Sequence, residues 1–375
     1  MPAPKIAIVT DWLTNMGGGE LVVLEAHKLF PDAPIYTSVY NADKMTAFAN
    51  CDVRTTYLQD ALPKFLRYKH ALWPVLRPFA FRKLDLSDFD IILSITSAEA
   101  KQVRKTRPDQ VHISYIHTPI RYYWSHYEEF KNEFNFGPLT LLIRPLIPLF
   151  VRWMRKIDLE SIPGIDVLIA NSSVTQERIK QYYNRPSTVV HPPVEIDRFT
   201  PPPRTEREGY VLWGRHVPYK RFDLAIEACN NLLRPLTVIG SGPDTERLKS
   251  LAGPTINFVG RVSDEELVRI AQHSGGFLFP NEEDFGISAV EALAAGTPVI
   301  GYAKGGVLDI VQDGETGVLF KEQSVESLVA AIERFESLSF LPATLHRKSK
   351  RFAASLFDQK LQKIVSSNTP KSSQK

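Results

Sequence analysis

The chain has 375 residues, of which 43% are hydrophobic and 23% are charged. This length exceeds one ordinary core and fits two domains of about 150–200 residues each. The composition is that of a folded protein and excludes an intrinsically disordered chain. The formal net charge of +3 is too small and too evenly spread to indicate nucleic-acid binding.

The number of cysteines and the length of the apolar segments indicate in which cellular compartment the protein is expected. Cys51 and Cys229 lie in different halves of the chain without CxxC spacing, so we expect neither a disulfide framework nor a zinc site. The first residues run directly into a short apolar strand and lack the pattern of a signal peptide. No stretch reaches the ~18 consecutive apolar residues of a membrane-spanning helix. We therefore expect a cytoplasmic protein that can lie on the inner face of the cell membrane without crossing it.

Short apolar runs alternate with helical patterns along the whole chain. Runs rich in valine, isoleucine and leucine between helices are typical of buried parallel strands. The first half has such runs at residues 5–10, 91–96, 111–116 and 167–170, and the second half at residues 210–213, 236–239, 276–279 and 298–301. The sequence therefore predicts an α/β protein with two doubly wound, Rossmann-like parallel sheets.

A charged stretch with five prolines, residues 191–209, separates the two halves. Neither a helix nor a central strand accommodates so many prolines, so we expect a linker there. The linker would join an amino-terminal domain, residues 1–190, to a carboxyl-terminal domain, residues 210–345. Residues 346–366 are predicted to form a helix that packs back on the amino-terminal domain, and residues 367–375 a disordered tail.

Two loops of the first half are candidate binding elements. The loop MGGGE, residues 16–20, follows the first strand, and its glycines would leave amide groups available to a phosphate. Its spacing is neither a dinucleotide fingerprint nor a P-loop, so a plain turn is an equally good interpretation. His117, in SYIHTPIRYYW, follows the strand at 111–116 and lies near the edge where ligands bind. The alternative is a purely structural histidine.

Asp88 and Asp90 form a DxD sequence, the pattern by which some sugar transferases hold a metal ion. They precede the strand at residues 91–96 and therefore lie at its amino end, the wrong edge of the sheet for a ligand. We expect solvent-facing side chains and no metal site.

In the second half, GRHVPYKR at residues 214–221 follows a strand directly. Arg215 and Lys220 could both reach a diphosphate at the carboxyl edge of the sheet; the alternative is a solvated basic loop. Further on, Ser263 and Glu266 form a helix-capping box, which is the simpler role for this segment. Asp264 could instead accept hydrogen bonds from guanine.

The most informative segment is NEEDFGISAVEALAAGTPVI, residues 281–300. It places Glu283 and Glu291 eight residues apart, across a strand end, a loop and the start of a helix. Amide groups of residues 285–287 would point outward at the positive end of this helix, where a phosphate or a sugar hydroxyl can be held. Carboxylates accept hydrogen bonds from hydroxyl groups, so the segment suits a polyhydroxylated ligand. Acidic residues that only complement the helix dipole are the weaker interpretation.

Taken in order, GGGE, the histidine after a strand, GRxxPYKR, FVGRVSDEEL, the Glu-x7-Glu segment and GGVLDIVQDGETGVLF resemble the retaining glycosyltransferase family 4. The resemblance covers nearly the whole chain and implies the GT-B fold, two Rossmann-like domains facing a central cleft. YIHTPIRYYW and PNEEDFGI look most like mannosyltransferases of bacterial and archaeal surface-polysaccharide assembly, the O-antigen type. This implies transfer of mannose from GDP-mannose to a saccharide acceptor, with no cofactor and no metal.

The resemblance also implies roles for individual residues. Arg215 and Lys220 would bind the donor diphosphate, Glu291 the ribose hydroxyls and Glu283 the transferred sugar. His117 would lie beside that sugar, so that His117, Arg215, Lys220 and Glu283 form the catalytic group. The other expected donor contacts are Gly17, Gly18, Val262, Asp264, Phe285, Gly286 and Ile287.

Residues 61–84 and 137–156 combine basic and aromatic side chains and contain no acidic residue. This mixture suits an anionic membrane surface and predicts a lipid-linked acceptor; two exposed helices with buried aromatic rings are the alternative. Two other functions also fit the sequence. One is the same fold with a UDP-sugar donor, and the other is a catalytically silent protein that binds nucleotide sugars.

Overall fold

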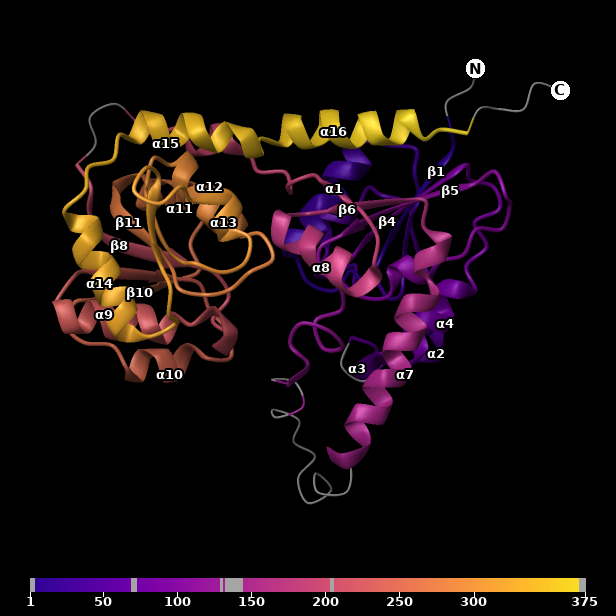
Figure 1. Cartoon of the computed structure of the whole chain (residues 1–375), viewed down its shortest axis with the longest axis horizontal. Coiled ribbons are helices and arrows are strands. Elements are labelled where there is room, and N and C mark those ends of the chain that lie inside the picture. Colours follow the sequence, from indigo (N-terminus) through magenta and orange to yellow (C-terminus); the bar gives the residue numbers. More distant parts are fainter. Residues whose placement is uncertain (1–3, 69–72, 129–130, 132–143, 203–205, 371–375) are drawn as a thin grey trace. The chain divides into compact units, whose positions relative to one another are not determined.

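The computed structural model describes residues 4–68, 73–128, 131, 144–202 and 206–370 (Figure 1). They form two compact units. Unit 1 comprises the chain up to His191 together with the residues from Asp358 onward, and unit 2 comprises Pro192–Phe357. Each unit is built on a sheet whose strands are all parallel, as the apolar runs predict.

The sheet of unit 1 has seven strands in the order β3-β2-β1-β4-β5-β6-β7. The order reverses between β1 and β4, so the loops that follow these two strands border the crevice where sheets of this kind bind ligands. All residues of β1 and β4 are buried. The strands are β1 (Ile6–Thr10), β2 (Ile35–Thr37), β3 (Val53–Thr55), β4 (Ile91–Thr96), β5 (Val111–Ile116), β6 (Val167–Ala170) and β7 (Thr188–Val189).

The helices of unit 1 include one with two distinct faces. Helix α7 (Ile147–Glu160) buries Ile147, Val151, Met154 and Ile157, spaced three or four residues apart, and this single stripe packs on the unit. The opposite face is exposed, and Figure 1 shows the amino-terminal end of α7 extending away from the sheet of its unit. The other helices described are α1 (Gly18–Leu29), α2 (Leu58–Ala61), α3 (Lys64–Arg67), α4 (Leu76–Arg82) and α8 (Ser173–Tyr183).

The sheet of unit 2 has six strands in the order β10-β9-β8-β11-β12-β13 and reverses between β8 and β11. Its strands are β8 (Glu208–Trp213), β9 (Leu236–Ile239), β10 (Ile256–Gly260), β11 (Ser274–Phe279), β12 (Val299–Tyr302) and β13 (Gly317–Phe320). Its helices are α9 (Phe222–Leu232), α10 (Thr245–Ser250), α11 (Asp264–His273), α12 (Ile287–Ala294), α13 (Val307–Ile310), α14 (Val325–Glu336) and α15 (Pro342–Ser349).

The stretch predicted as a linker groups with unit 2 from Pro192 onward. The prolines exclude a regular helix, but a 3-10 turn at Ile196–Phe199 buries Ile196 and Phe199 in the core of unit 2. Two apolar side chains thus anchor a stretch whose composition resembles a linker.

The carboxyl-terminal helical region is interrupted between residues 349 and 354. Helix α15 ends at Ser349, and α16 (Ala354–Ser367) begins after a 3-10 turn. The residues from Asp358 onward group with unit 1. Asn368 bonds back to the Ile364 carbonyl, and residues 371–375 of the predicted tail lie outside the described residues.

None of the helices in the described part of the chain combines the length and the apolar character that crossing a membrane requires.

Candidate functional site

In unit 2, the loops that leave β8 and β11 meet at the point where the strand order reverses. Lys220 Nζ, at the end of the first loop, lies 2.5 Å from Glu283 Oε1 in the second, and the two side chains are only 16% and 19% exposed. The structure therefore brings together two of the residues that the sequence indicated. The pair places a cation and a carboxylate side by side at the carboxyl edge of the sheet.

Gly214 and Arg215 leave β8 beside this pair. Gly214 has φ of +147°, and a Cβ there would lie 3.4 Å from Lys220 Nζ, so the ammonium group packs against this glycine. Arg215 comes next and is exposed. The loop thus presents two cationic residues at the carboxyl edge of the sheet.

The loop of residues 282–286 is held by a double glycine that follows β12. The amide of Gly306 donates to the Glu283 carbonyl at 2.8 Å. A Cβ on Gly305 would overlap that carbonyl oxygen, and one on Gly306 would overlap the backbone of Phe285. Only glycines allow the loop after β12 to lie in direct contact with the loop of residues 282–286. Gly305 and Gly306 therefore fix the position of the Glu283 backbone.

Helix α12 begins where this loop ends and carries Glu291. Gly286 starts it with φ of +107°, and the buried Phe285 packs edge-on against Phe352 at 5.5 Å. Glu291 Oε2 accepts a hydrogen bond from Trp213 Nε1 at 3.1 Å. Burial raises the pKa of Glu291 to about 7. Trp213 ends β8, and it is a residue of this site that the sequence analysis missed.

Asp264 begins α11, next to Val262 and Ser263. Ser263 caps the helix, as predicted, by accepting from the Glu266 amide at 3.2 Å. The Asp264 carboxylate is exposed, and it pairs with Arg198 Nη1 at 2.9 Å. The charges of Arg198 and Asp264 both act on the pKa of Glu291, so the three side chains share one region of unit 2. Arg198 was also not predicted as a site residue, because it lies in the stretch predicted as a linker.

Unit 1 brings the glycine loop and His117 together. A Cβ on Gly19 would lie 3.4 Å from His117 Nε2, so the first turn of α1 passes close to the imidazole that follows β5. Gly17 and Gly18 start this turn and are exposed. Burial, and to a smaller extent the charge of Asp11, raises the pKa of Glu20 to about 7.

Asp11 follows β1 and connects the two loops at the strand reversal of unit 1. Its buried carboxylate accepts from Thr96 Oγ1 at 2.8 Å and from the amides of Ser97, Ala98 and Ala100 at 2.7, 3.0 and 2.7 Å. Asp11 is not among the site residues that the sequence predicts. A charged residue placed directly after a buried strand was the available signal.

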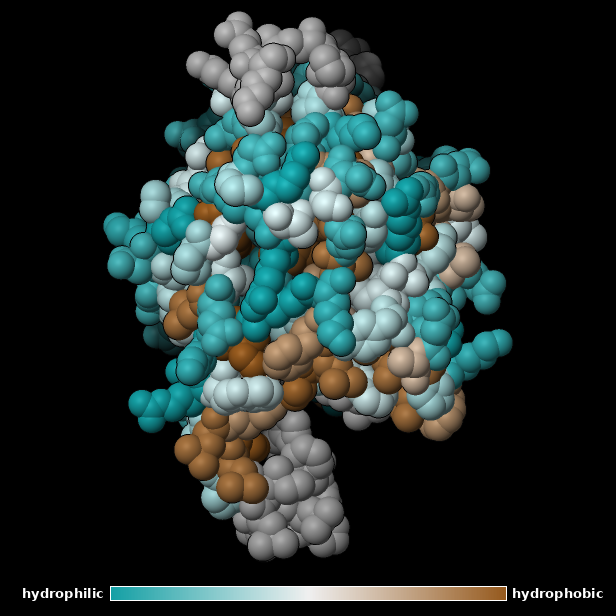
Figure 2. Space-filling model, turned by 90° about the vertical axis from the view of Figure 1, so that its right-hand side faces the viewer, coloured by the Kyte–Doolittle hydropathy of each residue, from teal (hydrophilic) through white to brown (hydrophobic). Residues whose placement is uncertain are grey.

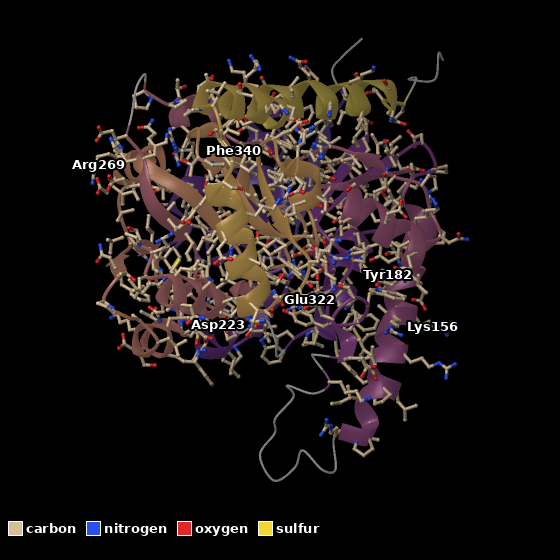
Figure 3. The ribbon with its side chains drawn as sticks, turned by 60° about the vertical axis from the view of Figure 1, so that its left-hand side comes forward. Lys156, Tyr182, Asp223, Arg269, Glu322 and Phe340 are labelled. Carbon is tan, nitrogen blue, oxygen red and sulfur yellow. The ribbon has the colours of Figure 1, made fainter. Side chains whose placement is uncertain are left out.

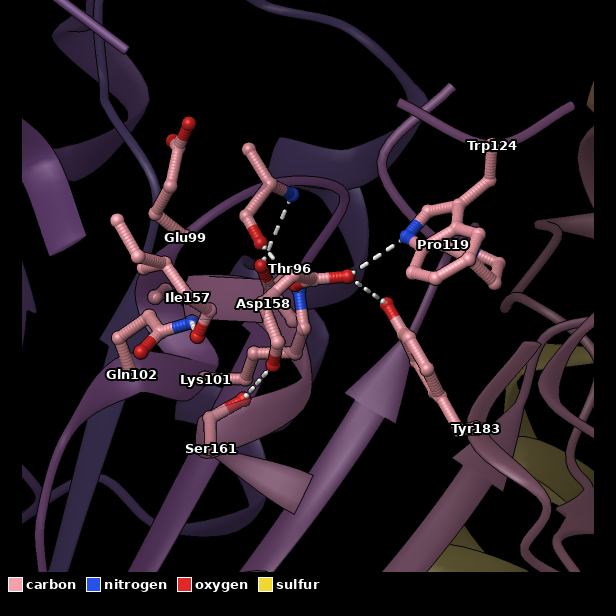
Figure 4. A network of polar contacts seen from close by, with 12 residues as sticks. Thr96, Glu99, Lys101, Gln102, Pro119, Trp124, Ile157, Asp158, Ser161 and Tyr183 are labelled. Carbon is pink, nitrogen blue, oxygen red and sulfur yellow. Dashed lines mark hydrogen bonds and ion pairs between the residues drawn. The ribbon is translucent and has the colours of Figure 1, made fainter. Parts of the chain in front are cut away.

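A buried polar network joins α7 to the segment that follows His117 (Figure 4). Lys101 Nζ and Asp158 Oδ1 lie 2.7 Å apart, and each side chain is 1% exposed. Asp158 Oδ2 accepts from Trp124 Nε1 at 2.8 Å and from Tyr183 Oη at 2.9 Å. The Trp124 ring also stacks on Tyr182 of α8, which is labelled in Figure 3, at 5.0 Å between centroids. The position of this segment thus depends on α7 and α8.

Asp88 and Asp90 lie before β4, at the amino edge of the sheet. Asp90 accepts from the Lys5 amide at 3.0 Å and pairs with Arg107 at 3.0 Å, whereas Asp88 is exposed. In the part of the chain that the structure describes, no three His, Cys, Asp or Glu side chains are grouped so that they could hold a metal ion.

The basic and aromatic segments are only partly exposed. Arg77 is buried in a 2.7 Å ion pair with Glu99, and Phe81 belongs to a core cluster, so neither contributes to a surface. Both are held by contacts from segments distant in sequence. Residues 69–72 and 137–143 of these segments lie outside the described residues.

The two parallel Rossmann-like sheets constitute the GT-B fold of glycosyltransferases. An Anabaena protein, HepE, solved in complex with UDP, matches 96% of this chain and 100% of its own with a TM-score of 0.70 at 16% identity. Residues 193–352 match the family model described as "Glycosyl transferases group 1". This segment lies within unit 2, which is therefore a domain of that family.

Two curated relatives are similar over about half of the chain. A D-inositol 3-phosphate glycosyltransferase of Mycobacterium sp. (strain KMS) is 33% identical over 214 residues, 50% of this chain and 48% of that protein. A GDP-mannose-dependent alpha-(1-6)-phosphatidylinositol monomannoside mannosyltransferase of Mycobacterium tuberculosis (strain ATCC 25618 / H37Rv) is 30% identical over 200 residues, 45% of this chain and 52% of that protein. The chain thus spans about half the length of these relatives, and neither is an O-antigen enzyme by name.

Proposed function

We propose that the protein is a retaining glycosyltransferase that transfers mannose from GDP-mannose to a lipid-linked saccharide in surface-polysaccharide assembly, without a metal cofactor. The observation that carries this proposal is the Lys220–Glu283 pair at the strand reversal of a glycosyl transferases group 1 domain. We further propose that the enzyme is cytoplasmic and works on the inner face of the cell membrane.

The donor would be held along the carboxyl edge of unit 2. Arg215 and Lys220 would bind its diphosphate through charge-assisted hydrogen bonds. Glu291, fixed by Trp213, would accept hydrogen bonds from the ribose hydroxyls, and Glu283 would accept them from the mannose hydroxyls. Amides at the start of α12 would add backbone contacts to the sugar and phosphate.

In the proposed reaction the acceptor hydroxyl attacks from the face that the diphosphate leaves. The bond from the anomeric carbon to the diphosphate oxygen breaks as the new glycosidic bond forms, and the acceptor proton passes to the departing diphosphate. Negative charge grows on the leaving oxygen, so a positioned cation stabilises the transition state more than the bound donor. Lys220 is the residue best placed for that role, because Glu283 orients its ammonium group.

The guanine base is supported by the GDP-mannose-dependent relative and by Asp264, a carboxylate that can accept from guanine N–H groups. The first experiment is a thermal-shift titration with GDP-mannose, GDP, UDP-glucose and UDP, because a ligand that binds only the folded state raises the melting temperature. Stabilisation by the guanine pair alone is the expected result. A response to the uridine pair alone would replace mannose by another donor, and no response at all would contradict the proposal.

The lipid-linked acceptor and the membrane surface are supported by α7. Its outer face carries Leu149 and Trp153, 65% and 43% exposed, together with the exposed Arg152 and Lys156 (Lys156 in Figure 3). The spacing of three or four residues puts all four in one stripe. In Figure 2, which views the molecule from the right-hand side of Figure 1, brown, apolar atoms gather in the lower part of the view. An apolar stripe flanked by cations is the pattern of an element that lies on an anionic bilayer.

Charge reversal on α7 should therefore weaken membrane binding. Each well-placed cation contributes about 1 kcal/mol at an anionic surface, so the double variant Arg152→Glu/Lys156→Glu should bind at least about tenfold more weakly. The measurement is cosedimentation with phosphatidylcholine–phosphatidylglycerol vesicles at low salt. The control is Lys249→Glu/Arg269→Glu, which makes the same change of charge on exposed helices of unit 2. Equal losses in the two double variants would show a non-specific effect of net charge.

Gly306→Ala should abolish nucleotide binding without unfolding unit 2. The new Cβ would overlap the Phe285 backbone, so Phe285 and the amides at the start of α12, which would contact the donor phosphate, must move away. The matched control is Gly164→Ala in unit 1, where a Cβ meets nothing within 4 Å. Calorimetric titration with GDP measures both variants. A folded Gly306→Ala protein that binds GDP with wild-type affinity would show that nucleotide binding does not depend on the position of the loop of residues 282–286.

A further inference from the structure

His216 lies in the loop after β8, between the two proposed diphosphate ligands, and it is completely buried. Its ring meets Phe222 of α9 edge-on at 5.2 Å and Phe258 of β10 at 6.0 Å. A polar ring enclosed by aromatic side chains costs free energy unless hydrogen bonds compensate for its lost hydration. Its hydrogen bonds therefore indicate what it does.

Both the ring and the backbone of His216 bond to the segment that follows β9. Nδ1 lies 2.9 Å from Thr245 Oγ1, and the same hydroxyl accepts from the Gly242 amide at 2.9 Å. The His216 amide donates to the Ser241 carbonyl at 3.2 Å, and the Asp244 amide donates to the His216 carbonyl at 3.1 Å. Except for the bond between Gly242 and Thr245, these bonds join the loop after β8 to residues 241–245.

Glycines bring these two segments into direct contact. A Cβ on Gly242 would overlap the His216 carbonyl, and one on Gly240, which has φ of +118°, would overlap the Gly214 carbonyl. No side chain separates the two loops. The position of residues 214–220 therefore depends on the hydrogen bond between the His216 ring and Thr245.

We propose that His216 is a positioning residue, which sets the orientation of Arg215 and the path of the loop toward Lys220. This inference rests on the proposed function, since it concerns the same donor site. Arg215 is adjacent to His216, and the 3-10 turn that ends with Lys220 begins two residues after it. A displaced ring would therefore move both cations away from a diphosphate.

The protonation state of the ring follows from its surroundings. Burial lowers the pKa of His216, although the Ile239 carbonyl and Asp244 favour the charged form, and Lys249 opposes it. Asp244 is itself ion-paired with Arg247 at 2.7 Å. The aromatic neighbours from α9 and β10 carry no charge. The ring is therefore neutral at neutral pH, and it takes up a proton only as the pH falls below the ordinary histidine value of about 6.5.

The test is GDP binding by calorimetry on the full chain, with wild type, His216→Phe, His216→Asn and Thr245→Val. Phenylalanine keeps the packing and loses the hydrogen bond, so GDP should bind about ten- to a hundredfold more weakly. Asparagine places an amide near the Nδ1 position and should restore most of that affinity. Thr245→Val, which removes the partner, should weaken binding like phenylalanine. His273→Phe, an exposed histidine at the opposite edge of the sheet, is the control.

The pH profile separates positioning from a merely structural role. GDP itself titrates near pH 6, so the informative quantity is the ratio of wild-type to His216→Phe affinity. This ratio should fall toward one as the pH drops from 7.5 to about 5, because the wild-type ring becomes charged. A folded phenylalanine variant with wild-type affinity and an unchanged ratio would overturn the inference, as would an asparagine variant as weak as phenylalanine. A wild-type protein that binds neither GDP nor UDP would instead refute the proposed function.

Discussion

Replacing Lys220 with alanine should lower turnover of GDP-mannose by about 100-fold or more while leaving the fold intact. A preorganised donor aimed at developing charge contributes roughly 2.7–4 kcal/mol to the transition state, and Lys220 is such a donor in the proposed mechanism. The loss should appear in kcat more than in KM, since the charge on the leaving oxygen exists only during the reaction. Steady-state kinetics with GDP-mannose measures both constants.

Three further variants test the specificity of this result. Removing Lys220 also leaves Glu283, the proposed mannose ligand, without its partner, so Lys220→Ala/Glu283→Gln is compared with Glu283→Gln alone. The difference in turnover between these two variants measures the effect of the missing cation in the absence of an unpaired carboxylate. Lys249→Ala removes a lysine from another Lys–Glu pair, Lys249 with Glu246, which is exposed on α10 and should leave turnover unchanged. A folded Lys220→Ala enzyme with near-normal kcat would contradict the role that we assign to Lys220.

Eight of the thirteen described strands and their ends could be predicted, because they form continuous apolar runs, whereas β2, β3, β7, β10 and β13 were not predicted. Continuous apolar runs between helices mark buried parallel strands whatever the tertiary context. Once the strands are placed, residues that follow them must lie at the carboxyl edge, and this places Arg215, Lys220 and Glu283 in one region. To predict that Lys220 and Glu283 meet, at 2.5 Å in the structure, one needs to know in addition only that β8 and β11 are neighbours in the sheet.

The contacts that tune the site could not be predicted in this way. Trp213 supports Glu291, and Arg198 pairs with Asp264, through segments 78 and 66 residues apart in sequence. Arg198 lies in a proline-rich stretch whose composition indicates a linker, although Ile196 and Phe199 anchor it in the core. Local patterns carry no information about which distant side chain faces a carboxylate, so such partners appear only with the fold.

Breaking the Lys101–Asp158 pair should have the largest effect on stability. Both side chains are 1% exposed, and removing one partner of a buried pair leaves an uncompensated charge that costs about 3–5 kcal/mol. Lys101→Met should therefore lower the free energy of unfolding of unit 1 by that amount. Urea denaturation followed by tryptophan fluorescence reports on this unit, because the Trp124 indole donates to Asp158 directly.

The matched variant is Lys105→Met, which removes a lysine from the more exposed pair with Asp166. Such a pair contributes about 1 kcal/mol or less, so this variant should remain close to wild type. Lys101→Met/Asp158→Asn should regain part of the loss, because asparagine removes the charge and keeps an oxygen for Trp124 and Tyr183. Equal losses in the two single variants would mean that burial does not distinguish the pairs. If Asp158→Asn brings no recovery, the cost of Lys101→Met comes from lost packing rather than from an unpaired carboxylate.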